Sequence, residues 1–151
     1  MQKNIVCDAS CLILLNRIDQ LDLLQKVFGE IWITNIIARE IKIVNPEWMK
    51  IRNPSSVLQT GLVNLLDPGE ASALSLAAEL EDALLIIDEA KGRKVAKRMG
   101  IDITGTLGVI ITAKNKGYIS AVKPLLERIQ VTNFRISSDL IRIVLESTNE
   151  N

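Results

Sequence analysis

Short apolar runs, each followed by a helix-like segment, are the feature of this sequence that most restricts its fold. The clearest runs lie within residues 4–8, 31–33 and 83–87. After each of them, apolar residues recur at helical spacing. Strands without polar alternation are typical of a parallel sheet that helices cover on both faces. The sequence therefore predicts a three-layer α/β/α fold with a central, mostly parallel sheet.

The remaining elements are expected at positions set by cap and turn residues. Residues 46–54, bracketed by two prolines, are expected to be irregular, and Asp67 is interpreted as a turn residue. Further strands are predicted at 62–66 and 101–103. Helices are predicted at 11–15 with Ser10 as cap, 21–27, 36–44 after the cap-type residues Thr34 and Asn35, 70–80 opened by Glu70, 91–99, 106–116, 125–129 and 140–145.

Length and composition indicate one domain with an aliphatic core. The chain has 151 residues, of which 48% are apolar and only 3% aromatic. A chain of this length can bury a sizeable core, and this apolar content is too high for a disordered protein. We expect a domain over residues 1–146 and a frayed tail over 147–151.

Histidine is absent, which excludes Ser-His-Asp and Cys-His catalysis and the usual histidine-rich zinc sites. The two cysteines, Cys7 and Cys11, are interpreted as small core residues in a reducing compartment. No secretory signal is recognisable, and no apolar run reaches the roughly 18 residues of a membrane span. We therefore expect a cytoplasmic protein that does not enter a membrane.

Charge is balanced overall but not along the chain. Residues 1–88 carry 7 basic and 12 acidic side chains, whereas residues 89–151 carry 11 basic and 6 acidic ones. The net charges of the two parts are therefore −5 and +5. This distribution is compatible with an acidic pocket beside a basic surface.

Acidic residues follow the predicted strands. Asp8 and Asp88 come directly after buried runs, while Glu40 and Glu70 lie in early turns of the helices that follow a strand or a turn. Ligands of an open parallel sheet bind at the carboxyl ends of its strands. We therefore expect these four acids to converge on one crevice.

Crowded carboxylates repel one another, and a hard divalent cation such as Mg²⁺ or Mn²⁺ removes that conflict. Such an ion can also activate water and stabilise charge on a phosphate, so an acid cluster without histidine fits metal-assisted phosphodiester hydrolysis. Structural roles are the alternatives. Glu70 and Glu89 can each be an acid at a helix N-terminus, and Glu40 can be a solvated neighbour of Arg39.

A basic segment follows Asp88. Residues 91–98 contain five basic side chains and no acid, which fits either a solvated helix face or a surface that contacts RNA phosphates. The sequence Gly105-Thr106-Leu107-Gly108 lacks the ending of a P-loop and is interpreted as a tight strand-to-helix turn. The candidate substrate-binding residues are Ser10, Arg93, Lys94 and Thr106.

Several motifs together resemble the PIN-domain superfamily. They include Asp8-Ala9-Ser10, Ile33-Thr34-Asn35 followed by Glu40, Gly69-Glu70-Ala71, Leu85-Ile86-Ile87-Asp88-Glu89 and Gly105-Thr106-Leu107-Gly108. The later motifs are similar to the prokaryotic DUF3368-type PIN-like proteins, relatives of VapC-like toxins. The resemblance covers nearly the whole chain, and the order and spacing of the motifs make it more specific than any motif alone.

This resemblance implies a Mg²⁺- or Mn²⁺-dependent ribonuclease that acts on RNA, often with an antitoxin partner and often as a homodimer. Asp8 matches the first acid of the family, Glu40 the second and Asp88 the fourth, with Glu89 as an extra candidate. Glu70 stands where the family usually has an aspartate. All four matched acids are the candidate catalytic and metal-binding residues.

Three other functions also use acids at the ends of strands or a PIN-like fold. A PIN-like binding or regulatory module with little catalysis is favoured by the balanced charge and by Glu70. A response-regulator phosphoacceptor is disfavoured because its late lysine is missing. A haloacid-dehalogenase-type phosphatase is disfavoured because residues 8–10 read Asp-Ala-Ser instead of Asp-x-Asp.

Overall fold

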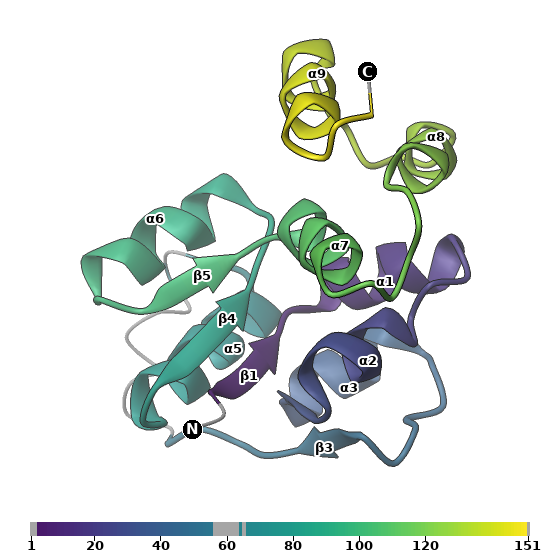
Figure 1. Cartoon of the computed structure of the whole chain (residues 1–151). Helices are drawn as coiled ribbons and strands as arrows, with labels where there is room; N and C mark the ends of the chain where they lie inside the picture. Colours follow the sequence, from purple (N-terminus) through teal and green to yellow (C-terminus); the bar gives the residue numbers. More distant parts are fainter. Residues whose placement is uncertain (1–2, 56–63, 65, 151) are drawn as a thin grey trace.

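Strands and helices alternate along the first two thirds of the chain, and helices alone follow (Figure 1). The computed structural model describes residues 3–55, 64 and 66–150. Its strands are β1 (Asn4–Cys7), β2 (Ile31–Ile33), β3 (Met49–Ile51), β4 (Ala83–Ile86) and β5 (Asp102–Thr104). Its described helices are α1 (Ala9–Arg17), α2 (Leu23–Phe28), α3 (Asn35–Ile41), α5 (Pro68–Glu79), α6 (Ala90–Arg98), α7 (Thr106–Asn115), α8 (Lys123–Gln130) and α9 (Ser138–Ser147).

The five strands form one sheet in the order β3-β2-β1-β4-β5, and every neighbouring pair is parallel. The central pair aligns Asn4 with Ala83 and Cys7 with Ile86. All strands therefore end at the same edge. The α/β class and the parallel sheet predicted from the apolar runs are confirmed.

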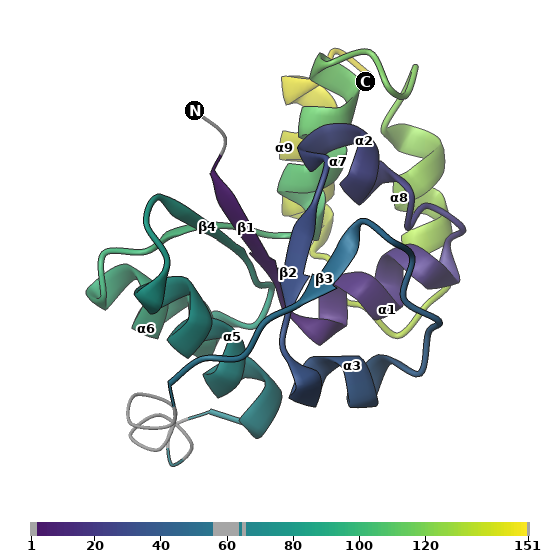
Figure 2. The same cartoon turned by 90° about the horizontal axis from the view of Figure 1, so that it is seen from below.

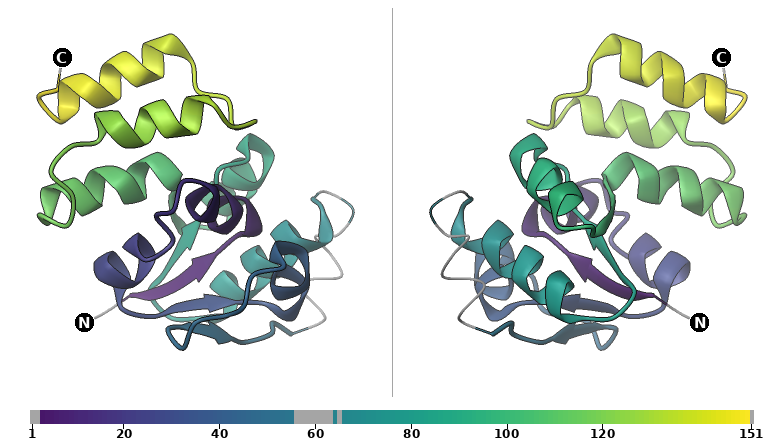
Figure 3. Two further views of the ribbon diagram at one scale, coloured as in Figure 1. Left: turned by 90° about the vertical axis from the view of Figure 1, so that its right-hand side faces the viewer. Right: turned by 90° about the vertical axis from the view of Figure 1, so that its left-hand side faces the viewer.

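Helices cover both faces of the sheet, as a sheet buried on both sides requires. Figure 2 shows α5 and α6 on one side and α2 and α7 on the other. The last two helices extend the second side, because α7, α8 and α9 stack on one another (Figure 3). The molecule thus has the three layers expected from the sequence.

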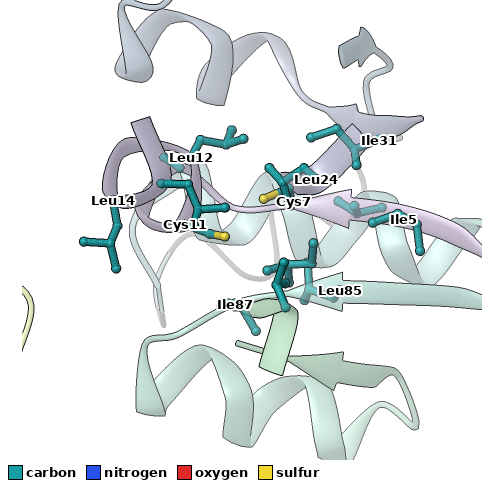
Figure 4. Close-up of a cluster of buried hydrophobic side chains, with 14 of the residues drawn as sticks. Ile5, Cys7, Cys11, Leu12, Leu14, Leu24, Ile31, Leu85 and Ile87 are labelled. Atoms are coloured by element: carbon teal, nitrogen blue, oxygen red, sulfur yellow. The ribbon is translucent and has the colours of Figure 1, made fainter. Parts of the chain in front are cut away.

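The core is aliphatic, as the composition predicts. Leu12, Leu24 and Leu85 are fully buried, and so are the two cysteines, Cys7 and Cys11. Figure 4 shows both sulfur atoms among the aliphatic side chains of β1, β4 and α1. Burial raises the pKa of the Cys7 thiol well above its ordinary value, so this thiol stays protonated and acts as an apolar core group.

Some predicted elements differ from the structure. Residues 46–54 are not wholly irregular, because Met49–Ile51 forms the edge strand β3 beside β2. The helix predicted to reach Val44 ends at Ile41, where Lys42 adopts a left-handed conformation with φ 51°. The strand predicted at 62–66 lies mostly outside the described residues, and Asn64 and Leu66 are in a turn and a bend.

Residues 147–150 also differ from the predicted frayed tail. Glu150 pairs with Lys114 at 2.9 Å and accepts hydrogen bonds from the backbone N–H groups of Val122 and Lys123. Burial acts to raise the pKa of Glu150, but Lys114 and these N–H groups together lower it to about 2.

Over the described ranges, no helix is both long enough and apolar enough to cross a membrane.

Thr34 links β2 and α3 to α5. Its buried hydroxyl caps α3 by accepting the Ile37 N–H at 3.3 Å and lies 2.7 Å from the Ser72 hydroxyl. Since Ser72 donates its own proton to the Gly69 carbonyl, Thr34 must donate to Ser72. The contact fixes the start of α3 against the first turn of α5.

The Thr34→Val variant should therefore lower the free energy of unfolding by about 1–3 kcal/mol, because it removes a cap and leaves a buried N–H without its acceptor. Urea denaturation would measure the change. Ser137→Ala, which removes the exposed cap of α9, is the matched control and should cost less. Equal losses in the two variants would contradict the importance of the buried contact.

Candidate active site

The candidate site lies where the chain reverses its direction across the sheet. After β1 the chain adds β2 and β3 on one side, and it then returns to add β4 and β5 on the other. Ligands of parallel sheets bind beyond the carboxyl ends of the strands at such a switch point. Asp8 follows β1 directly, and its backbone N–H donates to the Ile86 carbonyl of β4 at 3.0 Å. Asp88 follows two residues later, so both acids stand at the switch point.

Asp8 is a buried acid with an exposed fraction of 5%. It occupies the N-cap position of α1, but its side chain makes no cap hydrogen bond. Burial is the main cause that raises its pKa from 3.8 to about 7, and the Ala9 N–H opposes the change. The negative charges of Asp67, Glu40 and Asp88 raise the pKa further, in that order. These four acids therefore share one electrostatic environment.

Glu70 is the second buried acid, with an exposed fraction of 7%. Burial, followed by its contact with Asp67, raises its pKa to about 9. Its Oε2 atom is buried and has no hydrogen-bond partner among the described residues. The same atom lies so close to Gly92 that a Cβ there would be 3.1 Å away. Glu70 is thus an acid in contact with α6 that forms no ion pair with a Lys or Arg of the described residues.

Asp67 belongs to the cluster, although its neighbours in the sequence indicate a turn. It is the N-cap of α5, and its carboxylate accepts the Glu70 N–H at 2.9 Å. The helix begins at Pro68 and not at Glu70. The signal was present in the sequence, because Asp before Pro, with Glu two residues after that Pro, is typical of a helix start. Contacts with Glu70 keep the pKa of Asp67 below its ordinary value.

Glu40 reaches the cluster from α3. It lies in the last turn of that helix and not in an early one, and it is exposed. Its carboxylate lies directly against Gly69, where a Cβ would require the Glu40 side chain to move. Partial burial and the charge of Asp67 raise its pKa. Because α3 packs on α5, an acid seven residues after β2 still faces the switch point.

Asp88 is half-buried and held by α7. Its Oδ1 atom accepts the Thr106 N–H at 2.8 Å, and its Oδ2 atom accepts the Thr106 hydroxyl at 2.6 Å. Thr106, the first residue of α7, is therefore a partner of the site, as the sequence placed it. Arg93 is brought there too, since its Nη1 donates to the Ile87 carbonyl at 2.8 Å.

Ser10 differs from its expected role, whereas Glu89 and Lys94 have positions that the sequence also allowed. Ser10 does not cap α1, because Asp8 occupies the cap position, and the Ser10 hydroxyl is buried without a partner among the described residues. Glu89 caps α6 by accepting the Gly92 N–H at 2.9 Å, which is its structural alternative. Lys94 is exposed on α6. No hydrogen bond or ion pair joins Lys94 to the acids within the described ranges.

The five acids Asp8, Glu40, Asp67, Glu70 and Asp88 form a cluster without a paired cation. Among the described residues, none of them forms an ion pair with Lys or Arg. Nor do any three acids of the described ranges stand close enough together to hold a metal ion in their present arrangement. A cavity of about 350 Å³ is lined by Asp67, Glu70, Glu89 and Lys91, among others.

The donor set nevertheless fits a hard divalent cation. Carboxylate oxygens are the ligands that Mg²⁺ prefers, and it commonly takes one or two of them and retains several waters. The partnerless Glu70 oxygen and the raised pKa values of Asp8 and Glu70 indicate negative charge that lacks compensation.

The chain was compared with known protein families and with curated proteins. The DUF3368 family model, described as a PIN domain, matches residues 4–150. This match confirms the resemblance seen in the motifs. No curated protein matches the chain.

Stability without metal should depend on pH through Asp8 and Glu70. An acid with a raised pKa in the folded protein binds its proton more tightly there than in the unfolded chain. The free energy of unfolding should therefore fall as pH rises from about 4 to about 7 for Asp8, and on towards about 9 for Glu70. For Asp8 alone the loss is on the order of 4 kcal/mol.

Thermal unfolding across this pH range, in the presence of a chelator, would measure the effect. Asp8→Asn should reduce the pH dependence, whereas Asp22→Asn, at an exposed cap on α2, should leave it unchanged. Equal pH dependence of stability in the wild type and in Asp8→Asn would contradict the interpretation.

Proposed function

Since the chain belongs to the DUF3368 family of PIN domains, we propose that it is a metal-dependent endoribonuclease. PIN domains are generally nucleases that use divalent metals. Asp8, Glu40, Glu70 and Asp88 are the proposed metal-binding and catalytic residues, and Mg²⁺ or Mn²⁺ is the proposed ion. We add Asp67 to this set, because it contacts Glu70 and its charge acts on Asp8.

One observation carries the proposal. Glu70 is buried beside the buried Asp8 with an oxygen that has no partner in the described part of the chain. Burying two acids without a cation costs stability. A protein tolerates this cost where the acids bind a ligand. A divalent cation would let both acids ionise at neutral pH and would give the Glu70 oxygen a partner.

The protein residues have separable roles in this proposal. A bound Mg²⁺ or Mn²⁺ would supply a water of lowered pKa and positive charge beside the phosphate. Thr106 holds both oxygens of Asp88 and so orients that acid. Asp67 fixes the start of α5 and thereby the position of Glu70. Ser10, with its buried hydroxyl, is close in sequence to Asp8 and is proposed as a contact to substrate or to the water around the ion.

The substrate would meet the site along α6. Lys91, Lys94, Lys97 and Arg98 are exposed on this helix, which starts two residues after Asp88. Basic side chains beside an acidic site bind the phosphates of RNA without selecting bases. Arg93, anchored on the Ile87 carbonyl, and Lys94 are the proposed phosphate contacts nearest to Asp88.

The biological role that the family resemblance supports is that of a toxin in a type II toxin–antitoxin pair. A cytoplasmic location, an antitoxin partner and a homodimer are parts of this proposal. Glu70 in place of the usual aspartate is compensated in our proposal by Asp67, which stands at the N-cap of the same helix.

Cleavage of single-stranded RNA in the presence of Mn²⁺ tests the activity. Asp8→Asn should reduce the rate by at least about a hundredfold, because it removes a buried metal ligand, while circular dichroism stays unchanged. Asp22→Asn is the control for the loss of one negative charge. Equal cleavage by wild type and Asp8→Asn would exclude the assignment.

A catalytically weak PIN-like module that binds nucleic acid is the second candidate. It is supported by the absence, within the described ranges, of three acids already spaced to hold a metal. Calorimetric titration with Mn²⁺ separates the two candidates. The nuclease should bind Mn²⁺ with an affinity that falls about 10- to 100-fold in Thr106→Val, which loses the hydroxyl that holds Asp88. No binding at millimolar Mn²⁺ would favour the second candidate.

A further inference from the structure

A second cavity is lined by Asp88. It has a volume of about 440 Å³, within the range of about 300–1,000 Å³ typical of ligand pockets. Asp88 and Arg93 form one wall, and the turn between β5 and α7 forms another. The opposite wall comes from far along the chain, from Phe134 and Arg135 between α8 and α9 and from Leu140 of α9. We call this cavity the arginine groove.

The arginine groove carries two arginines, Arg93 and Arg135, that form no ion pair with any carboxylate of the described residues. Asp88 directs both oxygens to Thr106 instead. Arg93 and Asp88 both lie against Gly105, since a Cβ there would be 2.9 Å from Arg93 Nη1 and 2.7 Å from Asp88 Oδ1. Two such guanidinium groups in one groove are suited to a phosphate.

The groove also has an aromatic and apolar wall. Phe134 is one of only five aromatic residues in the chain. Its backbone N–H donates to the Thr132 hydroxyl at 3.1 Å, that hydroxyl donates to the Ile129 carbonyl at 2.6 Å, and its half-buried side chain packs against the core. Leu107 and Leu140 line the same cavity, and Leu140 is 40% exposed. A planar base can stack on a ring held in this way.

We propose that the arginine groove binds one unpaired nucleotide of the RNA substrate, with its base on Phe134 and its phosphate on Arg93 and Arg135. The inference rests on the proposed function, which it deepens by assigning to this groove a subsite for one nucleotide of the substrate. A base within a duplex is stacked and paired, so it cannot present its face to Phe134. An acidic peptide could satisfy the arginines, but it would not need an aromatic wall.

Fluorescence anisotropy with a labelled oligouridylate tests the stacking part, with Ca²⁺ in place of Mg²⁺ to prevent cleavage. Phe134→Leu keeps an apolar side chain and removes the ring, so it should weaken binding by about fivefold or more. Phe134→Tyr should restore binding. An abasic oligomer of the same length should bind wild type and Phe134→Leu equally, since it has no base to stack.

The same assay at several salt concentrations tests the phosphate part. Arg135→Ala should weaken the binding of both oligomers and reduce the salt slope by about 0.7, the value for one phosphate contact on a single strand. Arg142→Ala removes an arginine that pairs with Asp139 and Glu146 on α9 and does not line the groove. This control should leave the slope unchanged.

The outcomes separate the groove from the nuclease. If wild type cleaves RNA while Phe134→Leu and Arg135→Ala bind like wild type, the groove proposal is wrong and the proposed function stands. If wild type binds but does not cleave, and both variants bind more weakly, the groove stands without catalysis. Binding of an acidic peptide in preference to oligouridylate, or equal binding of duplex and single strand, would overturn the groove proposal.

Discussion

Repulsion among carboxylates at the switch point is the constraint on which the rest of the site depends. Five acids from four segments converge there, and two of them, Asp8 and Glu70, are almost fully buried. The fold places them there by strand order, because β1 and β4 are neighbours whose ends face one crevice. Holding two of these acids protonated is one way to tolerate that arrangement, and binding a divalent cation is the other. Protonation of these acids and binding of a cation therefore compete, and each of them stabilises the folded protein.

The fold was largely predictable because its strands are buried on both faces. Runs such as Leu85–Ile87 contain no polar residue, so they are recognisable without knowledge of their neighbours. The edge strand β3 was missed because it is not buried on both faces. It pairs with β2 alone, and only Met49 of its three residues is buried, so Lys50 interrupts the apolar pattern. The end of α3 was missed because Lys42 adopts a left-handed conformation that apolar periodicity does not reveal.

The site was predictable where an acid directly follows a strand, as with Asp8 and Asp88, because strand ends share an edge. Glu40 and Glu70 needed the further assumption that their helices return to that edge, and the packing of α3 on α5 provides it. Asp67 was interpreted as a turn residue because Pro68 and Gly69 follow it. Its role as the cap that positions Glu70 was therefore not predicted. Phe134 and Arg135 had no local signal, because only the docking of α8 and α9 brings them to Asp88.

The uneven charge along the chain becomes an uneven charge in space. Asp8, Glu40, Asp67 and Glu70 come from the acidic first part, while Arg93 and Arg135 come from the basic second part. Asp88 closes the first part and lines the arginine groove, so the boundary between the two regions runs through it. A cation attracted to one side and a phosphate attracted to the other would therefore meet at this residue. A net charge of zero conceals this separation, because nucleic-acid binding depends on local charge and not on the total.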